Sequence, residues 1–257
     1  MWKLTRKEIA SVISDLGCRL VLFREPYNQF SDPVACDLFC KLMRLKMTGY
    51  RRKHDQRVLP IDTYDYLATH IALCVSEKDG SLKPINAYKS ISSRITDQHV
   101  LPFPAISLLN TCSEKLEAKR FERRLVGELG VKEVFYNGSW TMDETYKNNE
   151  RVRQFLQEAT LATLVQYYAY QKRFPVISGA VTRFGVDRWK ETVGFEDIYD
   201  SNGDMISRFH SPVFSNSELR FMVLNRVSDE GLLHAKDYSE LWDHRIELES
   251  DQLALAA

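Results

Sequence analysis

The sequence lacks the short motifs that assign many enzymes directly to a class. It contains no Gly-x-Ser-x-Gly of serine hydrolases, no His-Glu-x-x-His of zinc proteases and neither common glycine-rich phosphate loop. The six histidines are scattered, and none stands in a ligand cluster of the kind that holds a metal. Serine or zinc hydrolysis and nucleotide-kinase chemistry are therefore poor interpretations, and we expect neither a metal ion nor a cofactor.

The sequence also has no net charge, because 35 lysines and arginines balance 35 aspartates and glutamates. Nucleic acid is therefore not an expected partner, and any charged docking surface must be local. The five cysteines are odd in number and form no Cys-x-x-Cys pair, which predicts reduced thiols and a cytoplasmic location. No apolar run reaches the about 20 residues of a membrane span, and Glu8 with its helical surroundings argues against a signal peptide.

The chain has 257 residues without a Gly/Ser-rich linker or an internal repeat, which predicts one domain over 1–257. Strands in hairpins, interleaved with helices, predict a mixed α/β (α+β) fold. Apolar spacing predicts helices at 3–16, from Ser31 onward, at 112–130, 150–173 and 187–193, and a helical extension over about 233–257. Runs of β-branched and aromatic residues predict strands at 18–26, 66–77, 82–92, 131–140, 174–182, 206–214 and 220–227.

Two aspartates, Asp62 and Asp65, stand together just before the predicted strand at 66–77, in the stretch Ile-Asp-Thr-Tyr-Asp-Tyr-Leu. Their position has two interpretations. They can end a loop through hydrogen bonds from their carboxylates to the backbone. They can also form part of a pocket that receives a positively charged group. Position alone favours neither interpretation.

Two stretches resemble one enzyme family. Residues 61–67, IDTYDYL, resemble the I-D-x-Y-D-x-L block of acyl-homoserine lactone synthases, and residues 176–198 resemble the last strand and helix of the GNAT-type fold of these enzymes. The resemblance spans about residues 40–200. It implies a mixed sheet with helices on both faces, in which two central strands, at 131–140 and 175–183, splay apart in a V that holds an acyl-pantetheine arm.

The resemblance also implies a reaction. Acyl-homoserine lactone synthases move an acyl group from acyl-carrier protein to the amine of S-adenosylmethionine, and release an acyl-homoserine lactone and methylthioadenosine. By this likeness Asp62 and Asp65 bind the cationic cosubstrate. Arg44 and Lys89 are the candidates that bind its carboxylate. Glu133 is the predicted general base that makes the amine neutral for attack.

Two positions depart from the family pattern. Lys89 and Tyr136 stand where the family has arginines, so the acceptor pocket is expected to differ. Trp140 is expected to line the acyl pocket. Structural interpretations stay open for these residues, namely solvated surface positions for Arg44, Lys89 and Glu133 and core packing for Trp140.

The predicted turn at 142–151, MDETYKNNER, has no glycine and three acidic residues. Acetyltransferases that use coenzyme A have a glycine-rich turn there for the pyrophosphate, so acyl-carrier protein is the expected donor. Carrier proteins are acidic, which makes a local cluster of cations the predicted docking surface, with a solvated helix face as the alternative. Three other functions stay open: an N-acyl amino acid synthase, a non-catalytic binding module and a coenzyme-A-dependent acetyltransferase. The predicted docking residues are Arg120, Arg123, Arg124, Lys172 and Arg173.

Overall fold

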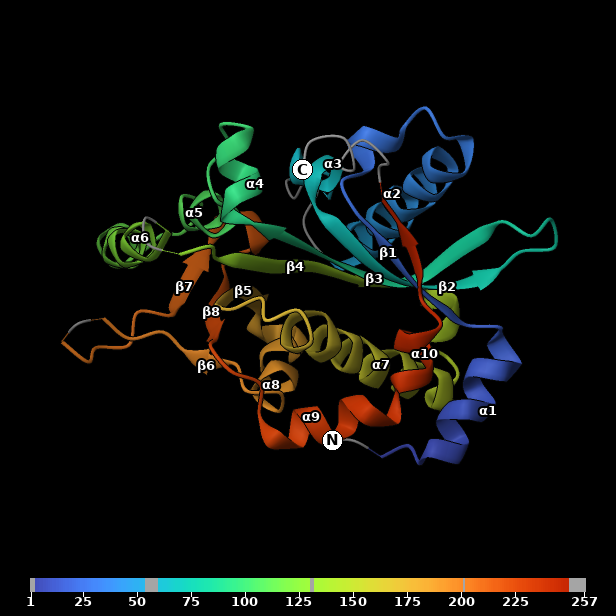
Figure 1. Cartoon of the computed structure of the whole chain (residues 1–257). Helices are drawn as coiled ribbons and strands as arrows, with labels where there is room; N and C mark the ends of the chain where they lie inside the picture. Colours follow the sequence, from blue (N-terminus) through green and yellow to red (C-terminus); the bar gives the residue numbers. More distant parts are fainter. Residues whose placement is uncertain (1–2, 54–59, 130–131, 201, 250–257) are drawn as a thin grey trace.

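A nine-stranded mixed sheet runs through the molecule, and helices cover both of its faces (Figure 1). The computed structural model describes residues 3–53, 60–129, 132–200 and 202–249. The strands follow the order β6-β8-β5-β4-β3-β2-β1-β9, and β7 pairs with β8 beside this path. Their bounds are β1 Arg19–Phe23, β2 Thr69–Ser76, β3 Leu82–Ser92, β4 Phe135–Met142, β5 Val176–Val181, β6 Glu196–Asp197, β7 Arg208–Ser211, β8 Ser217–Leu224 and β9 Ile246–Leu248.

Side chains of alternate residues divide the core between the two faces of the sheet. On β1, Leu20 and Leu22 pack on the face of the long helix α7, whereas Val21 and Phe23 pack on the face of α2. As expected from its nearly continuous apolar character, α7 is central and is buried from Leu161 to Tyr168. The α-helices are α1 Arg6–Leu16, α2 Pro33–Lys53, α3 Tyr64–Leu67, α4 Ser93–Gln98, α5 Pro104–Leu109, α6 Lys115–Leu129, α7 Glu150–Ala169, α8 Val186–Glu191, α9 Asp229–Asp237 and α10 Ser239–Asp243.

Two predicted elements differ from the structure. The strand predicted at 66–77 begins only at Thr69, because the preceding residues form the short helix α3, in which the Ala68 N–H donates to the carbonyl of Tyr64 at 2.8 Å. The helical tail is wrong at Ile246–Leu248, which form β9 parallel to β1. This strand covers the edge of β1 and packs Ile246 and Leu248 on the α2 face. The predicted tail residues 250–257 lie outside the described residues.

The predicted V between two central strands is confirmed, because the parallel strands β4 and β5 pair for only three residues. The pairs run from Phe135↔Val176 to Asn137↔Ser178. Beyond that point β4 continues along β3 to Met142, and β5 continues along β8 to Val181. Within β4 the register to β3 shifts, and Ser139 has a φ of 61°, as in a β-bulge. The two strands therefore diverge and leave facing edges unpaired.

Helix α2 crosses close to β4 at this bulge, and Gly49 allows the approach. A Cβ atom at Gly49 would lie 2.6 Å from Cγ2 of Thr141, which is buried on β4. A methyl group does not fit at that distance, and the β-branched Thr141 has little freedom to move away. A residue as small as glycine is therefore required for this helix to support the splayed strand.

Gly49→Ala should lower the free energy of unfolding by about 1–3 kcal/mol relative to the matched variant Gly127→Ala, through overpacking. Gly127 lies in α6 with no atom near its would-be Cβ, so alanine there should stabilise the helix by about 1 kcal/mol. Thr141→Ser removes the clashing methyl group, so the double variant Gly49→Ala/Thr141→Ser should regain the stability that Gly49→Ala loses. Urea unfolding measures the wild type, the two single glycine variants and the double variant. Equal effects of Gly49→Ala and Gly127→Ala on the free energy of unfolding would contradict the account.

Candidate active site

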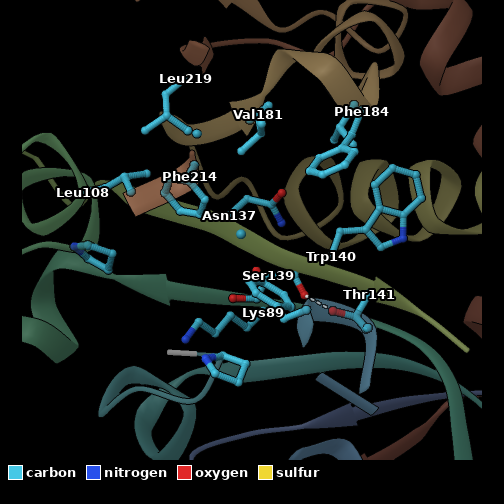
Figure 2. A pocket seen from close by; sticks show the side chains of 18 of the residues that line it. Lys89, Leu108, Asn137, Ser139, Trp140, Thr141, Val181, Phe184, Phe214 and Leu219 are labelled. Carbon is cyan, nitrogen blue, oxygen red and sulfur yellow. Dashed lines mark hydrogen bonds between the residues drawn. The ribbon is translucent and has the colours of Figure 1, made fainter. Parts of the chain in front are cut away.

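A cavity of about 770 Å³ occupies the V between β4 and β5, and this volume is typical of small-molecule sites. In Figure 2, Asn137, Ser139 and Trp140 of β4 lie opposite Val181 and Phe184, which belong to the end of β5 and the turn after it. Leu108, Phe214 and Leu219 gather at one end of the same space. The cavity therefore combines an apolar end with a wall made by the open edge of a strand.

The charged groups that line the cavity are mostly cations. They are Lys89, Lys147, Arg153 and Lys190, whereas Asp62 is the one carboxylate among the described lining residues. Lys147 also contacts Glu144, and Arg153 lies 3.9 Å from Glu150. A ligand with anionic groups suits this lining better than a ligand with only positive charge.

Behind the cavity wall, two lysines and two aspartates form a chain of ion pairs. Lys46 Nζ lies 2.6 Å from Asp65 Oδ1, and Lys89 Nζ lies 3.0 Å from the same oxygen. Lys89 Nζ also lies 2.5 Å from Asp62 Oδ1. Asp65 is fully buried and Lys46 and Lys89 nearly so, whereas the Asp62 side chain is 44% exposed and reaches the cavity. Asp62 is thereby held at the cavity wall by Lys89.

The pKa values follow from burial and from these neighbours. Burial opposes the charge of Asp65, but Lys89 and Lys46 outweigh it and hold the pKa of Asp65 at about 2. Burial and the nearby Lys89 lower the pKa of Lys46 to about 8. Burial opposes the charge of Lys89 as well, but Asp65 and Asp62 raise its pKa. At neutral pH the shared carboxylate of Asp65 therefore stabilises two buried cations.

Both interpretations of the aspartate pair apply in part. The Asp65 carboxylate accepts the N–H of Asp62 at 2.9 Å, so it does shape the turn. It also forms ion pairs with positively charged groups, but these are the lysines of the chain itself, Lys46 and Lys89. The predicted wall of two free carboxylates for a cationic cosubstrate is not what the structure shows, because Asp62 and Asp65 are both paired.

Two predicted residues lie away from the cavity. Arg44 is exposed on α2, and Lys46, two residues later on the buried side of the helix, lies where a cation meets Asp65. Glu133 is exposed before β4, with its carboxylate 3.6 Å from Arg94, and it does not line the cavity. A general base must reach the amine directly or through one water, and the position of Glu133 gives that role no support. The role of Glu133 stays a prediction.

Tyr136 and Trp140, in contrast, line the cavity from β4. Burial raises the pKa of Tyr136, so its hydroxyl stays protonated and can donate a hydrogen bond. Trp140 donates its indole N–H to Asn86 Oδ1 at 2.9 Å and packs 6.4 Å from Trp189, both rings lining the space. Trp140 is therefore at once a cavity residue and part of the packing under α7.

The predicted carrier-docking cations are largely engaged within the chain. Arg120 pairs with Asp200 and Asp204, and Arg124 donates to the carbonyl of Tyr199. Arg173 stacks on the rings of Tyr167 and Phe135. The other two, Arg123 and Lys172, are exposed. Carrier docking on this set stays a prediction, with fewer free charges than the sequence implied.

Sequence reasoning missed three cations of the cavity. Lys147 and Arg153 flank the start of α7, which Asn149 caps by accepting the N–H of Val152. Lys190 projects from α8 into the cavity wall. The N-cap asparagine was a signal that could have placed Lys147 and Arg153 together at a helix start, whereas Lys190 has no local signal.

In the described residues no cluster suits a metal ion, and none of the described helices is long and apolar enough to cross a membrane.

Comparison with solved structures supports the same architecture. The sequence matches no protein-family model and no curated protein. A coenzyme-A-dependent acyl-homoserine lactone synthase, BjaI, in complex with S-adenosylmethionine and isopentyl-CoA, is similar at a TM-score of 0.50, with 10% identity over 93% of this chain and 100% of that one. The chain has the fold of that synthase.

Other solved structures are similar over comparable lengths. The acyl-homoserine lactone synthase LasI has a TM-score of 0.48 and 10% identity, covering 90% of this chain and 97% of its own. FeeM, an N-acyl amino acid synthase from uncultured soil microbes, has a TM-score of 0.47 and 15% identity, covering 81% and 90%. The mixed sheet with its V between β4 and β5, together with the likeness to BjaI, confirms the predicted GNAT-like mixed fold.

Asp65→Asn removes the carboxylate that Lys46 and Lys89 share, and should lower the free energy of unfolding by about 3–5 kcal/mol at pH 7. Because the folded pKa of Asp65 lies below its unfolded value, this stabilisation is present above about pH 4 and is lost as the pH falls toward 2. Urea unfolding from pH 2 to 7 measures both effects. Asp62 is half-exposed, so Asp62→Asn should lower the free energy of unfolding by less. An Asp65→Asn protein as stable as wild type at pH 7 would refute the ion pairs of Asp65 with Lys46 and Lys89.

Proposed function

We propose that the protein is an N-acyltransferase, which moves an acyl group from a phosphopantetheine thioester to the amine of a small acceptor that carries a carboxylate. The observation that carries this proposal is the divergence of β4 and β5 after Asn137↔Ser178, with a cavity of about 770 Å³ between them. The fold shared with the lactone synthase BjaI supports the proposal at the level of architecture.

The unpaired strand edges suit the donor. A pantetheine arm is narrow and carries two amides, which can hydrogen-bond to the open backbone of β4 and β5 as an added strand would. The bulge at Gly138 and Ser139 turns local backbone groups away from regular pairing, at the place where a thioester oxygen would gain negative charge. Backbone N–H groups there would stabilise the transition state.

The cations at the start of α7 suit the phosphate of the same arm. Lys147 and Arg153 line the cavity, and the first turn of a helix favours anions. A single bridging phosphate needs no glycine-rich cradle, which is the reason to propose acyl-carrier protein as the donor. Coenzyme A is the competing donor, and it carries the same phosphopantetheine arm.

The acceptor is proposed from the charges at the other wall. Lys89 reaches the cavity beside Asp62, so a carboxylate and an amine of one acceptor can meet a cation and an anion there. S-adenosylmethionine and free amino acids share this head group. With Asp62 beside the amine, no second carboxylate remains among the described lining residues for a sulfonium, and this observation favours a free amino acid as the alternative acceptor.

Mass spectrometry of a reconstituted reaction tests the proposal. The purified protein is incubated with acyl-carrier protein or coenzyme A loaded with C4 to C16 acyl groups, together with S-adenosylmethionine or a mixture of the twenty amino acids. An acyl-homoserine lactone with methylthioadenosine identifies the first acceptor, and an N-acyl amino acid identifies the second. Donor binding without any acylated product would overturn the proposal in favour of a binding module.

Lys147→Ala and Arg153→Ala should each raise the KM for phosphopantetheine-linked donors about tenfold with little change in kcat, because about 1.4 kcal/mol of binding corresponds to a factor of ten. An acyl-pantetheine donor without the phosphate provides the matched control. Its KM should be the same for wild type and variants. Equal losses with both donors would show that these cations do not contact the phosphate.

Leu108→Trp should shorten the acyl chains that the protein transfers, because Leu108 lines the apolar end of the cavity beside Leu219. Each buried methylene contributes about 0.8 kcal/mol, so kcat/KM should fall about fourfold for each carbon beyond the new limit. Leu116→Trp on the exposed face of α6 is the control. A donor series from C4 to C16 measures the limit, and an unchanged profile would contradict the placement of the acyl chain.

A further inference from the structure

Lys190 is a buried lysine that forms no ion pair with a carboxylate in the part of the chain that the structure describes. Its side chain is 5% exposed, and its Nζ donates a hydrogen bond to Ser178 Oγ. The Phe195 ring lies 5.5 Å away. In the described part of the chain, Asp187 is the one group whose charge favours protonation of Lys190, and Asp187 itself lies 3.4 Å from Arg220. Lys46 and Lys89, the other buried lysines of this site, both contact Asp65.

This environment changes the protonation of the amine. Burial lowers the pKa of Lys190 to about 7, so a neutral amine is abundant at physiological pH. A buried lysine without a carboxylate partner is costly to keep for packing alone, because an apolar side chain would fill the same volume. Such a group in a cavity is a candidate for proton transfer.

The position of Lys190 coincides with the apex of the V. Ser178 Oγ donates to the carbonyl of Asn137 at 2.7 Å, and Asn137↔Ser178 is the last pair between β4 and β5. Lys190 also lines the cavity. Its amine is thus anchored by one hydrogen bond at the point where the strands part, and its other hydrogen-bonding positions are available to a bound molecule.

We propose that Lys190 is a catalytic residue of the acyl transfer, acting as the proton acceptor for the attacking amine. This inference rests on the function proposed above. The neutral acceptor amine attacks the thioester carbon and forms the C–N bond, while Lys190 Nζ takes one N–H proton. The tetrahedral intermediate collapses with cleavage of the C–S bond. Lys190 then returns the proton to the thiolate, so the products are an amide and a free thiol and Lys190 ends neutral.

The pH dependence of the reaction follows from the groups around Lys190. Burial disfavours the charged amine, and Asp187 on the same helix favours it. Lys89, Lys147 and Arg153 are the other cations that line the cavity. Asp62 on the far wall is paired with Lys89. The limb of the kcat/KM profile that rises with pH should therefore have an apparent pKa near 7, reporting the deprotonation of Lys190.

The decisive comparison is between wild type, Lys190→Met, Lys190→Arg and the exposed control Lys236→Met. Lys190→Met should lower kcat at least about 100-fold and remove the limb near pH 7, while donor binding measured by calorimetry with a thioether analogue stays within about twofold. Lys190→Arg keeps the charge but cannot accept a proton, so it should not restore activity. Lys236→Met should behave as wild type.

Each other outcome is assigned in advance. Acyl transfer by Lys190→Met at the wild-type rate, with the same pH profile, overturns the role of Lys190 and leaves the proposed function standing. Wild-type protein that transfers no acyl group to any acceptor overturns both. If Lys190→Met does not fold, wild-type protein labelled with ¹³C at lysine Cε decides, with Lys190→Arg for assignment. A Lys190 resonance that titrates near pH 7 supports the proposal, and one that titrates near pH 10 refutes it.

Discussion

The early end of the pairing between β4 and β5 is the feature on which the rest of the site depends. After Asn137↔Ser178 each strand stays with its other neighbour, β4 with β3 and β5 with β8. Beyond this pair the facing edges of β4 and β5 no longer pair with each other, and buried backbone groups without a partner are costly unless a side chain, a ligand or water completes them. The same divergence creates the volume of the cavity. The mixed sheet thus contains a local gap between two of its central strands.

The surrounding structure holds that gap open from both sides. On one face α2 lies close to the bulge of β4 at Gly49, and its Lys46 reaches Asp65 behind the wall. On the other face α7 fills the core, and α8 places Lys190 at the apex. The buried lysines therefore differ in kind. Lys46 and Lys89 share a carboxylate and hold Asp62 in place. Lys190 has no such partner among the described residues, and burial lowers its pKa to about 7.

Much of this fold could be predicted from the sequence because local patterns encode it. The capping box of Thr5 and Glu8, the apolar run of α7 and the hairpin of β2 and β3 all have short-range signals. The strand β9 had none, because its three residues pair only through a contact with β1 that is more than 200 residues away in sequence. Its short length and charged neighbours resemble a helical tail as much as an edge strand.

The site was predictable in part, through the resemblance of short sequence blocks to a known family. The block with Asp62 and Asp65 was found, and Lys89, Tyr136 and Trp140 were placed at a cavity that they do line, with Asp65 just behind it. Arg44 and Glu133 lie at exposed positions outside the cavity lining, since the orientation of a helix or the start of a strand decides exposure, and neither is visible in a linear pattern. Lys190 and Ser178 come together only when α8 folds back onto β5.

The central claim is that the V between β4 and β5 receives the donor. A crystal structure of the protein with an unreactive acyl-pantetheine thioether tests it most directly. The account predicts that the arm lies between the two strands, with its amides bonded to the edges beyond Asn137 and Ser178, its phosphate at Lys147 and Arg153, and its sulfur near Lys190. An analogue bound elsewhere on the protein, with the V still empty, would contradict it.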